Sequence, residues 1–216
     1  MHTLIITAHP SSKGFAHRIA SSYAKGLVLN TDTFEILDLY TTELKQDFLR
    51  FEHIRELDAD ENKTIIQTKI TSADELVFVH PIWWGGMPAI LKNFIDQNIT
   101  PGFGYKYQKD DNCNVKIIKL LAGKSARIFM TCDNVMWQYI MIGVPFVSIW
   151  FFFILDFCGI EARSIIVFDK MRRRTEEELI GLEQKIETIS RTNSKPFNPI
   201  LTLFKTMSKS KDLLGL

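Results

Sequence analysis

Residues 73–96, ADELVFVHPIWWGGMPAILKNFID, decide the fold expected for this chain. Residues 75–79 are a short apolar run of the kind found in buried parallel strands. Residues 89–97 have a helical pattern, and Pro88 is tolerated at the first turn of a helix. Two adjacent tryptophans and two adjacent glycines stand between them. The stretch therefore predicts a strand, a loop and a helix, with unusual residues where the strand ends.

Outside this stretch the chain repeats the alternation of strand and helix. The other strand candidates are short apolar or partly alternating runs at residues 3–8, 34–39, 126–131 and 163–168. The other helix candidates cover residues 14–29, 62–71, 135–155 and a segment that begins with the capping-box signature at 175–178. Five strands alternating with helices predict an α/β fold: an open, mostly parallel sheet with helices on both faces.

Two further segments do not follow the alternation of strand and helix. Residues 99–119 contain Pro-Gly and Asp-Asp-Asn, which are typical of loops. The tail after Thr192 contains Pro196 and Pro199, and we expect it to lie as an arm across the surface. The expected organisation is one domain over residues 1–192 and a C-terminal arm or tail over residues 193–216.

Composition argues against several classes of protein. The chain has 216 residues, 46% of them hydrophobic and 24% charged, so it can bury a sizeable core. The net charge of +1 gives no reason to expect a nucleic acid or an acidic membrane surface as partner. The N-terminus lacks the basic and long apolar regions of a signal peptide.

Metal and disulfide chemistry are not expected either. The three cysteines are far apart and never form CxxC, which favours a reducing cytoplasm. The sequence contains no HExxH motif and no clustered histidine, cysteine and aspartate ligands, so we expect no metal site.

The helix candidate at residues 135–155 carries no formal charge. Its length and apolarity would permit a membrane span. Gly143 and Pro145 interrupt it, however, and Gln138 is polar. We therefore expect a buried helix that also forms an oligomer interface and does not span a membrane. Peripheral contact with a membrane stays open as the alternative.

Ligands of open parallel sheets bind outside the carboxyl ends of the strands, where the strand order reverses. After the first strand, residues 9–15 form a short polar loop that leads into a helix. Free backbone N–H groups at a helix N-terminus suit a phosphate, and Ser11, Ser12 and Lys13 are further donors. An ordinary helix cap is the alternative.

The third strand is followed by the two tryptophans and the two glycines. A flat aromatic ligand needs flat apolar walls, which Trp83 or Trp84 can supply. It also needs close approach of the backbone, which Gly85 and Gly86 allow. The segment predicts a slot for a planar heterocycle, and the alternative is that the tryptophans only fill the core.

After the fourth strand come Thr131, Cys132, Asp133 and Asn134. Thr131 and Asn134 can hydrogen-bond the edge of a ring, and Tyr139 can place a phenol over it. Turn formation is the alternative. Cys132 is expected to be a small buried residue and not a nucleophile, because no histidine stands near it in the sequence.

Together these segments resemble the flavodoxin-like NAD(P)H:quinone oxidoreductase family. That family includes the mammalian quinone reductases, bacterial modulators of drug activity and ancillary subunits of potassium-efflux systems. The resemblance rests on residues 73–96 and on TLIITAHP (3–10), DLY (38–40), PGFGYKY (101–107) and FCG (157–159). It covers residues 3–190 and implies a flavodoxin-like five-stranded parallel sheet with the strand order 2-1-3-4-5.

The resemblance implies a bound flavin, FMN or FAD, with NAD(P)H as co-substrate and a homodimer as the assembly. The cofactor-binding residues expected from the three loops and from the resemblance are His9, Ser11, Lys13, Phe15, Ala16, Pro81, Ile82, Trp83, Trp84, Gly85, Thr131, Cys132, Asp133 and Asn134. Tyr139 is implied to be catalytic, through a hydrogen bond to the flavin or the quinone. Phe103, Gly104 and Tyr105 are implied to reach the substrate pocket, usually that of the neighbouring subunit.

The chain departs from the family at three positions. Residues 131–134 replace a common Thr-Thr-Gly-Gly, Pro145 replaces a histidine of the mammalian enzymes, and Ala16 replaces an asparagine. The first hypothesis is an enzyme that passes a hydride from NAD(P)H to the flavin and then two electrons to a quinone or similar aromatic acceptor. The second is a flavin-binding regulatory or ancillary subunit of a membrane transporter or other partner. The third is a member of the family that has lost its flavin.

Overall fold

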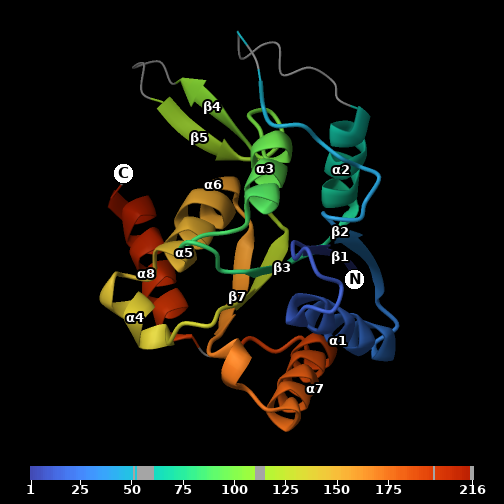
Figure 1. Cartoon of the computed structure of the whole chain (residues 1–216). Helices are drawn as coiled ribbons and strands as arrows, with labels where there is room; N and C mark the ends of the chain where they lie inside the picture. Colours follow the sequence, from blue (N-terminus) through green and yellow to red (C-terminus); the bar gives the residue numbers. More distant parts are fainter. Residues whose placement is uncertain (51, 53–60, 110–114, 197, 215–216) are drawn as a thin grey trace.

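A five-stranded parallel sheet forms the middle layer of the computed structural model, which describes residues 1–50, 52, 61–109, 115–196 and 198–214 (Figure 1). Its strands are β1 (His2–Thr7), β2 (Thr33–Asp38), β3 (Glu75–Pro81), β6 (Ser125–Thr131) and β7 (Glu161–Phe168). They lie in the order β2-β1-β3-β6-β7, and every neighbouring pair is parallel. Counted within the sheet, this is the predicted order 2-1-3-4-5, so the predicted fold class is confirmed.

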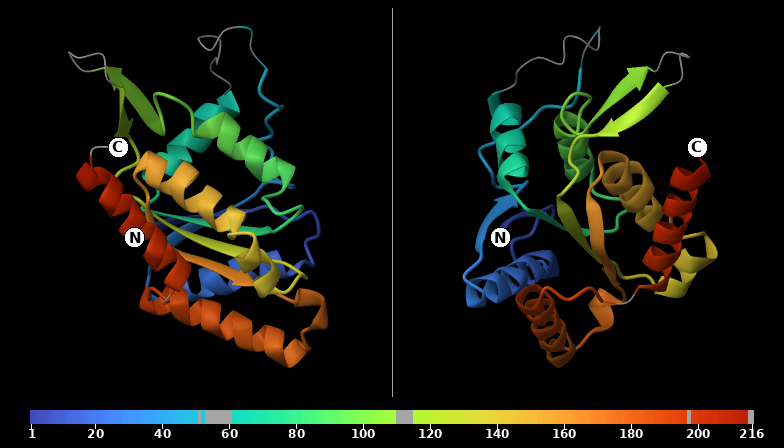
Figure 2. Two further views of the ribbon diagram at one scale, coloured as in Figure 1. Left: turned by 90° about the vertical axis from the view of Figure 1, so that its left-hand side faces the viewer. Right: turned by 180° about the vertical axis from the view of Figure 1, so that it is seen from behind.

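Helices cover both faces of the sheet, as the continuous apolar runs of the strands require. One face packs against α1 (Phe15–Leu29) and α7 (Glu176–Thr192). The other packs against α2 (Glu61–Ser72), α3 (Ala89–Asn98) and the helices of the long apolar segment (Figure 2). Every residue of β3 and β6 is buried between these layers. The strand order reverses beside β1, so the carboxyl ends of β1 and β3 mark the expected place for a ligand.

Helices α1 and α7 lie side by side beneath the sheet (Figure 1). A Cβ atom at Gly26 would collide with the backbone of α7, so the glycine permits the close approach. Arg18 of α1 forms ion pairs with Glu176, at 2.6 Å, and with Glu183. The predicted capping box is confirmed: Thr175 accepts from the backbone of Glu178, whose side chain accepts from the backbone of Thr175. The first turn of α7 is therefore held in place beside α1.

The expectation that residues 99–119 form a loop was wrong. Within this segment β4 (Tyr105–Lys109) and β5 (Val115–Lys119) pair as an antiparallel hairpin. Most of the side chains of both strands are exposed. Neither strand has the continuous apolar run of a buried strand, and this is why the pattern resembled a loop. Residues 110–114 lie outside the described part of the chain.

The helix candidate at residues 135–155 is not one helix. It contains α4 (Met136–Met141), α5 (Pro145–Ser148) and the π-helical turn η2 (Ile149–Leu155), and α6 (Asp156–Cys158) follows directly. The chain turns between α4 and α5, where Gly143 has φ of 78° and Val144 has φ of 45°. Among the described residues, no helix is long and apolar enough to cross a membrane.

The C-terminal tail is a docked helix and not an extended arm. Helix α8 (Pro199–Leu214) packs against η2, and Leu201 is buried. The ring of Phe204 lies 4.9 Å from that of Phe152, centroid to centroid. Asn198 caps the helix: its Oδ1 accepts from the N–H of Leu201 at 3.0 Å, and its Nδ2 donates to the carbonyl of Ile165 at 2.7 Å. Pro196 thus precedes the helix, and Pro199 is its first residue, where proline is tolerated.

Candidate functional site

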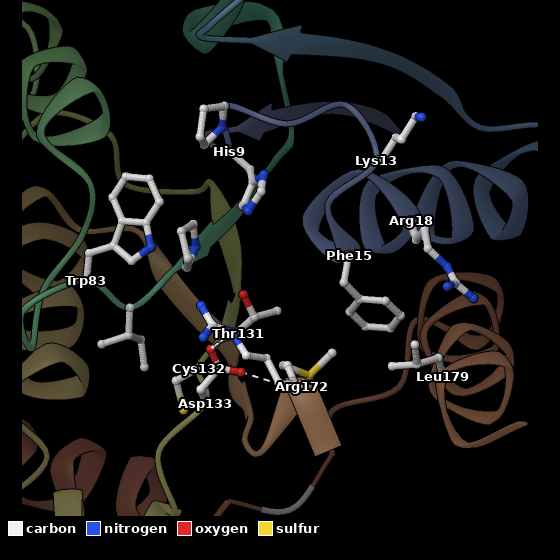
Figure 3. A pocket seen from close by; sticks show the side chains of 14 residues that line it. His9, Lys13, Phe15, Arg18, Trp83, Thr131, Cys132, Asp133, Arg172 and Leu179 are labelled. Atoms are coloured by element: carbon white, nitrogen blue, oxygen red, sulfur yellow. Dashed lines mark hydrogen bonds and ion pairs between the residues drawn. The ribbon is translucent and has the colours of Figure 1, made fainter. Parts of the chain in front are cut away.

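A cavity of about 510 Å³ lies at the carboxyl ends of β1, β3, β6 and β7 (Figure 3). It occupies the place where the strand order reverses. Its lining residues are His9, Pro10, Lys13, Phe15, Arg18, Pro81, Ile82, Trp83, Thr131, Cys132, Asp133, Met171, Arg172 and Leu179. Trp83 and Leu179 stand at opposite ends of the view, with Thr131 between them (Figure 3).

The loop after β1 is ordered by His9. Its Nδ1 lies 3.1 Å from the backbone nitrogen of Ser11 and 3.0 Å from the carbonyl of Ser11. Its ring packs where a side chain on Gly14 would stand, so the loop needs a glycine there. Helix α1 then starts at Phe15 without a side-chain cap. Its first N–H groups are therefore the part of the helix available to an anion.

The loop after β3 closes as a tight turn. The N–H of Trp83 donates to the carbonyl of Gly86 at 2.9 Å, and the N–H of Gly86 donates back at 3.0 Å. Between them Trp84 has φ of 52° and Gly85 has φ of 77°, the positive pair that a type I′ turn requires. Only Trp83 faces the cavity, because the turn directs Trp84 to solvent. The adjacent glycine therefore serves the turn, and one of the two tryptophans serves as a wall.

The opposite side of the cavity is formed by the ends of β6 and β7. Asp133, just after β6, accepts the backbone N–H of Arg172 and pairs with its guanidinium, each at 2.9 Å. Cys132, the residue directly after β6, is buried. Burial, together with the negative charges of Asp169 and Asp133, raises the pKa of its thiol to about 11. This environment favours the protonated thiol, which is the less nucleophilic form.

Tyr139 does not line the cavity. Its side chain is buried against Phe146, with the ring centroids 4.9 Å apart. Its hydroxyl accepts a hydrogen bond from the side-chain amide of Asn134 at 3.2 Å. Burial raises the pKa of Tyr139, so the phenol keeps its proton at neutral pH.

The structure brings most of the expected cofactor-binding residues together and leaves others apart. Those that line the cavity are His9, Lys13, Phe15, Pro81, Ile82, Trp83, Thr131, Cys132 and Asp133. Those that stand outside its lining are Ser11, Ala16, Trp84, Gly85 and Asn134. The expected catalytic residue, Tyr139, is outside the lining as well. The Ala16 side chain is buried in the core, so only its backbone is placed to meet a ligand.

The expected substrate-binding residues, Phe103, Gly104 and Tyr105, lie outside the lining of this cavity. Tyr105 lines a second cavity of about 400 Å³, next to Phe153 and Phe157. Gly104 packs near Ile99, and Phe103 packs against the core. Within a single chain, none of the three lines the first cavity.

Sequence reasoning missed five lining residues: Pro10, Arg18, Met171, Arg172 and Leu179. Arg18 follows Phe15 by three residues and so lies on the same side of α1. Met171 and Arg172 follow the fifth strand, whose carboxyl end lies on the same edge of the sheet. That strand end was the available signal. Arg18 and Arg172 each have carboxylate partners, whereas no ion pair holds Lys13 among the described residues.

Comparisons with known proteins place this geometry in a family. The family described as having a flavodoxin-like fold matches residues 1–191. An uncharacterized NAD(P)H oxidoreductase of Haemophilus influenzae is 30% identical over 148 residues, 67% of this chain and 70% of that protein. An FMN-dependent NADH:quinone oxidoreductase 2 of Mesoplasma florum is 28% identical over 144 residues, 62% of this chain and 65% of that protein.

The likeness extends to solved structures. The crystal structure of Smu.1420 from Streptococcus mutans UA159 has a TM-score of 0.77 and 28% identity, and the match covers 89% of this chain and 100% of that one. Some curated relatives are longer, and the matches to two of them cover only 46% and 55% of their length. Helix α8 lies beyond the part that the family matches. Residues 1–191 thus have the sequence pattern as well as the topology of the fold, and the chain belongs to the flavodoxin-like fold family.

Proposed function

We propose that the chain is a flavin-dependent oxidoreductase that takes a hydride from NADH or NADPH and delivers two electrons to a quinone or similar aromatic acceptor. The observation that carries the proposal is the cavity itself. It combines a tryptophan wall, a type I′ turn and the N-terminus of α1 at the place where the strand order reverses. The relatives named above, an NAD(P)H oxidoreductase and an FMN-dependent quinone oxidoreductase, support the same reaction class.

The residues present fit a flavin. Its flat ring needs an apolar wall, and Trp83, Pro81 and Ile82 supply one. Its phosphate needs donors and positive charge, and the start of α1, Lys13 and Arg172 supply them. A bound flavin would supply the electron and hydride chemistry, which no amino-acid side chain provides.

The contribution of the chain is orientation and electrostatics. Trp83 uses its N–H within the turn, so the N–H groups of Trp84 and Gly85 are the ones we propose for the ring edge. These dipoles would stabilise negative charge that develops during reduction. The hydroxyl of Tyr139, oriented by Asn134, is proposed to donate to the flavin or the acceptor.

We also propose a homodimer, with the 103–105 segment of each chain reaching the pocket of the other. Two features support it. Exposed apolar side chains lie on α4 and η2, among them Trp137, Met141 and Phe153. The 103–105 segment does not line the cavity of its own chain. Light scattering of the purified protein tests this, and a strictly monomeric protein would contradict it.

The visible absorption spectrum tests the proposed function. Purified protein is titrated with FMN and then with FAD, and the loaded protein is treated anaerobically with NADH or NADPH. We expect a flavin spectrum that bleaches with the nucleotide and returns on addition of a quinone. A protein that binds neither flavin, or a bound flavin that neither nucleotide reduces, would overturn the proposal.

A further inference from the structure

A buried histidine stands directly before the wall of the cavity. His80 is the next-to-last residue of β3, its side chain is fully buried, and its neighbour Pro81 lines the cavity. Both ring nitrogens have partners. Nδ1 lies 2.8 Å from the carbonyl oxygen of Pro81, and Nε2 lies 3.0 Å from the indole nitrogen of Trp150.

These partners select one tautomer. An indole N–H can only donate, so Nε2 of His80 must accept from Trp150. The proton of the neutral ring is then on Nδ1, which donates to the carbonyl of Pro81. Burial lowers the pKa of His80 to about 4, so the ring remains neutral at physiological pH. The carbonyl of Pro81 and the indole of Trp150 therefore require the same tautomer, and together they hold the ring at both nitrogens.

The hydrogen bond from Nδ1 of His80 is one of two that hold the peptide group between Pro81 and Ile82. That group contains the carbonyl of Pro81 and the N–H of Ile82. Its oxygen accepts from His80, and its N–H donates to the carbonyl of Thr131 at 2.8 Å. Pro81, Ile82 and Thr131 all line the cavity. The orientation of this peptide thus sets the direction in which the chain enters the turn at Trp83.

Trp150 comes from a different layer of the fold. It lies in η2, and its ring is packed 4.7 Å from Phe78 and 5.7 Å from His80, centroid to centroid. π-Helical turns occur often near functional sites. Here the π-helical turn η2 places the indole N–H of Trp150 at the end of β3, next to Pro81, which lines the cavity.

We propose that His80 and Trp150 are positioning residues: Trp150 holds the ring of His80 in place through Nε2, and His80 thereby fixes the Pro81–Ile82 peptide and the ring-binding wall that follows it. The consequence for cofactor binding rests on the proposed function. Without the indole donor, Nε2 loses its partner, and the imidazole is free to tilt away from the carbonyl of Pro81. The carbonyl of Pro81 would then lose its donor, and the wall would be held on one side only.

Trp150→Phe tests the pair, because it removes the indole N–H and keeps an aromatic ring. We expect the Kd for FMN to rise about fivefold to tenfold, the effect of one buried hydrogen bond. Phe78→Leu is the matched control. Phe78 touches the same Trp150 ring from the same face of β3, but it makes no hydrogen bond to it. It should lower stability while leaving the Kd within about twofold.

A second measurement needs no flavin. Nitrogen-15 spectra of the histidine rings report the tautomer, and amide hydrogen exchange reports the bond from Ile82 to Thr131. We expect the wild type and Phe78→Leu to show the Nδ1–H tautomer of His80 with a protected Ile82 amide. Trp150→Phe should shift the resonance of Nε2 of His80, which has lost its hydrogen bond, and lose roughly tenfold of the protection of the Ile82 amide.

The outcomes separate this proposal from the proposed function. Wild-type protein that binds no flavin would overturn the function, and the nitrogen-15 and exchange data would still decide the positioning role. An unchanged Nε2 resonance of His80 and unchanged Ile82 protection in Trp150→Phe would overturn the positioning role of the pair. Equal losses of FMN affinity in Trp150→Phe and Phe78→Leu would also overturn it, because packing alone would then explain the effect.

Discussion

Arg172 and Asp133 are joined twice across the rim of the cavity, once through the guanidinium and once through the backbone N–H of Arg172, each at 2.9 Å. The pair ties the end of β6 to the turn after β7. The Arg172 side chain is 87% exposed, so the ion pair adds little to stability. Arg172 also lines the cavity, so its charge is one that we propose for the flavin phosphate.

Arg172→Ala is expected to weaken FMN binding by about threefold to tenfold, because one cation facing the phosphate is lost. Titration of FMN at low and high salt measures this, and the loss should shrink at high salt. Arg173→Ala is the control, since Arg173 is exposed and its substitution removes the same charge from a residue that does not line the cavity. Equal losses of FMN affinity in Arg172→Ala and Arg173→Ala would show that affinity depends only on the net charge of the protein and would contradict a specific role for Arg172.

Gly85→Val tests the turn below Trp83. Gly85 has φ of 77°, so a β-branched residue there should cost roughly 1–2 kcal/mol of unfolding free energy. A Cβ at this position meets no protein atom within 4 Å, so any further loss of FMN affinity would come from crowding of the ligand. Chemical denaturation and FMN titration separate the two effects. Gly86→Val, at a residue without positive φ and with equal space, should be nearly neutral in stability.

Tyr139→Phe removes a buried hydroxyl and keeps the ring against Phe146. We expect FMN to bind within about twofold of wild type and quinone reduction to slow about tenfold, because a donor to developing charge is lost. Stopped-flow reoxidation of the reduced protein by a quinone measures the step. An unchanged rate would confine Tyr139 to a structural role.

Two leucines of α8 test the docking of the tail. Leu201 is buried and Leu203 is 58% exposed, although they are only two residues apart. Leu201→Ala should cost about 2–3 kcal/mol of unfolding free energy, and Leu203→Ala under about 0.5 kcal/mol. Urea unfolding measures both. Similar small costs would mean that α8 does not pack on η2 in solution.

His80 should make stability depend on pH. Its pKa is about 4 in the folded chain against an ordinary 6.5, so the unfolded state binds a proton between these values and the folded state does not. Stability should therefore fall as the pH is lowered from 6.5 to 4, by up to about 3 kcal/mol from this residue. Urea unfolding of wild type and His80→Gln over this range gives the difference curve, in which other titrating groups cancel. A flat difference curve would contradict the assignment.

The strands and the edge that carries the site follow from local sequence. A run buried on both faces is apolar at most positions, so the strands are recognisable as short and nearly continuous apolar runs. Because parallel strands end on one edge, the strand pattern is enough to place His9, Trp83 and Thr131 together. The capping box before α7 is equally local, since it depends on two residues three positions apart.

Other features depend on contacts between distant residues. The sequence does not say that Trp83 faces the cavity and Trp84 faces solvent, because the choice is made by the positive φ angles of the turn. It does not show that Arg172 reaches Asp133, since the two meet only when β6 and β7 pair. The hairpin at residues 105–119 and the docked helix α8 were missed because their side chains are mostly exposed or need a partner surface.

By itself, then, the sequence determined the strands and the edge where a ligand is expected, because periodic burial and strand direction are written in neighbouring residues. The strand order was implied by the resemblance to a known family and not by the local pattern. Only the tertiary structure decided which side chains line the cavity. It also decided that Trp150, seventy residues away from His80 in the chain, donates a hydrogen bond to that buried ring. A hydrogen bond between distant segments exists only once packing has excluded water from both partners, and no local pattern records it.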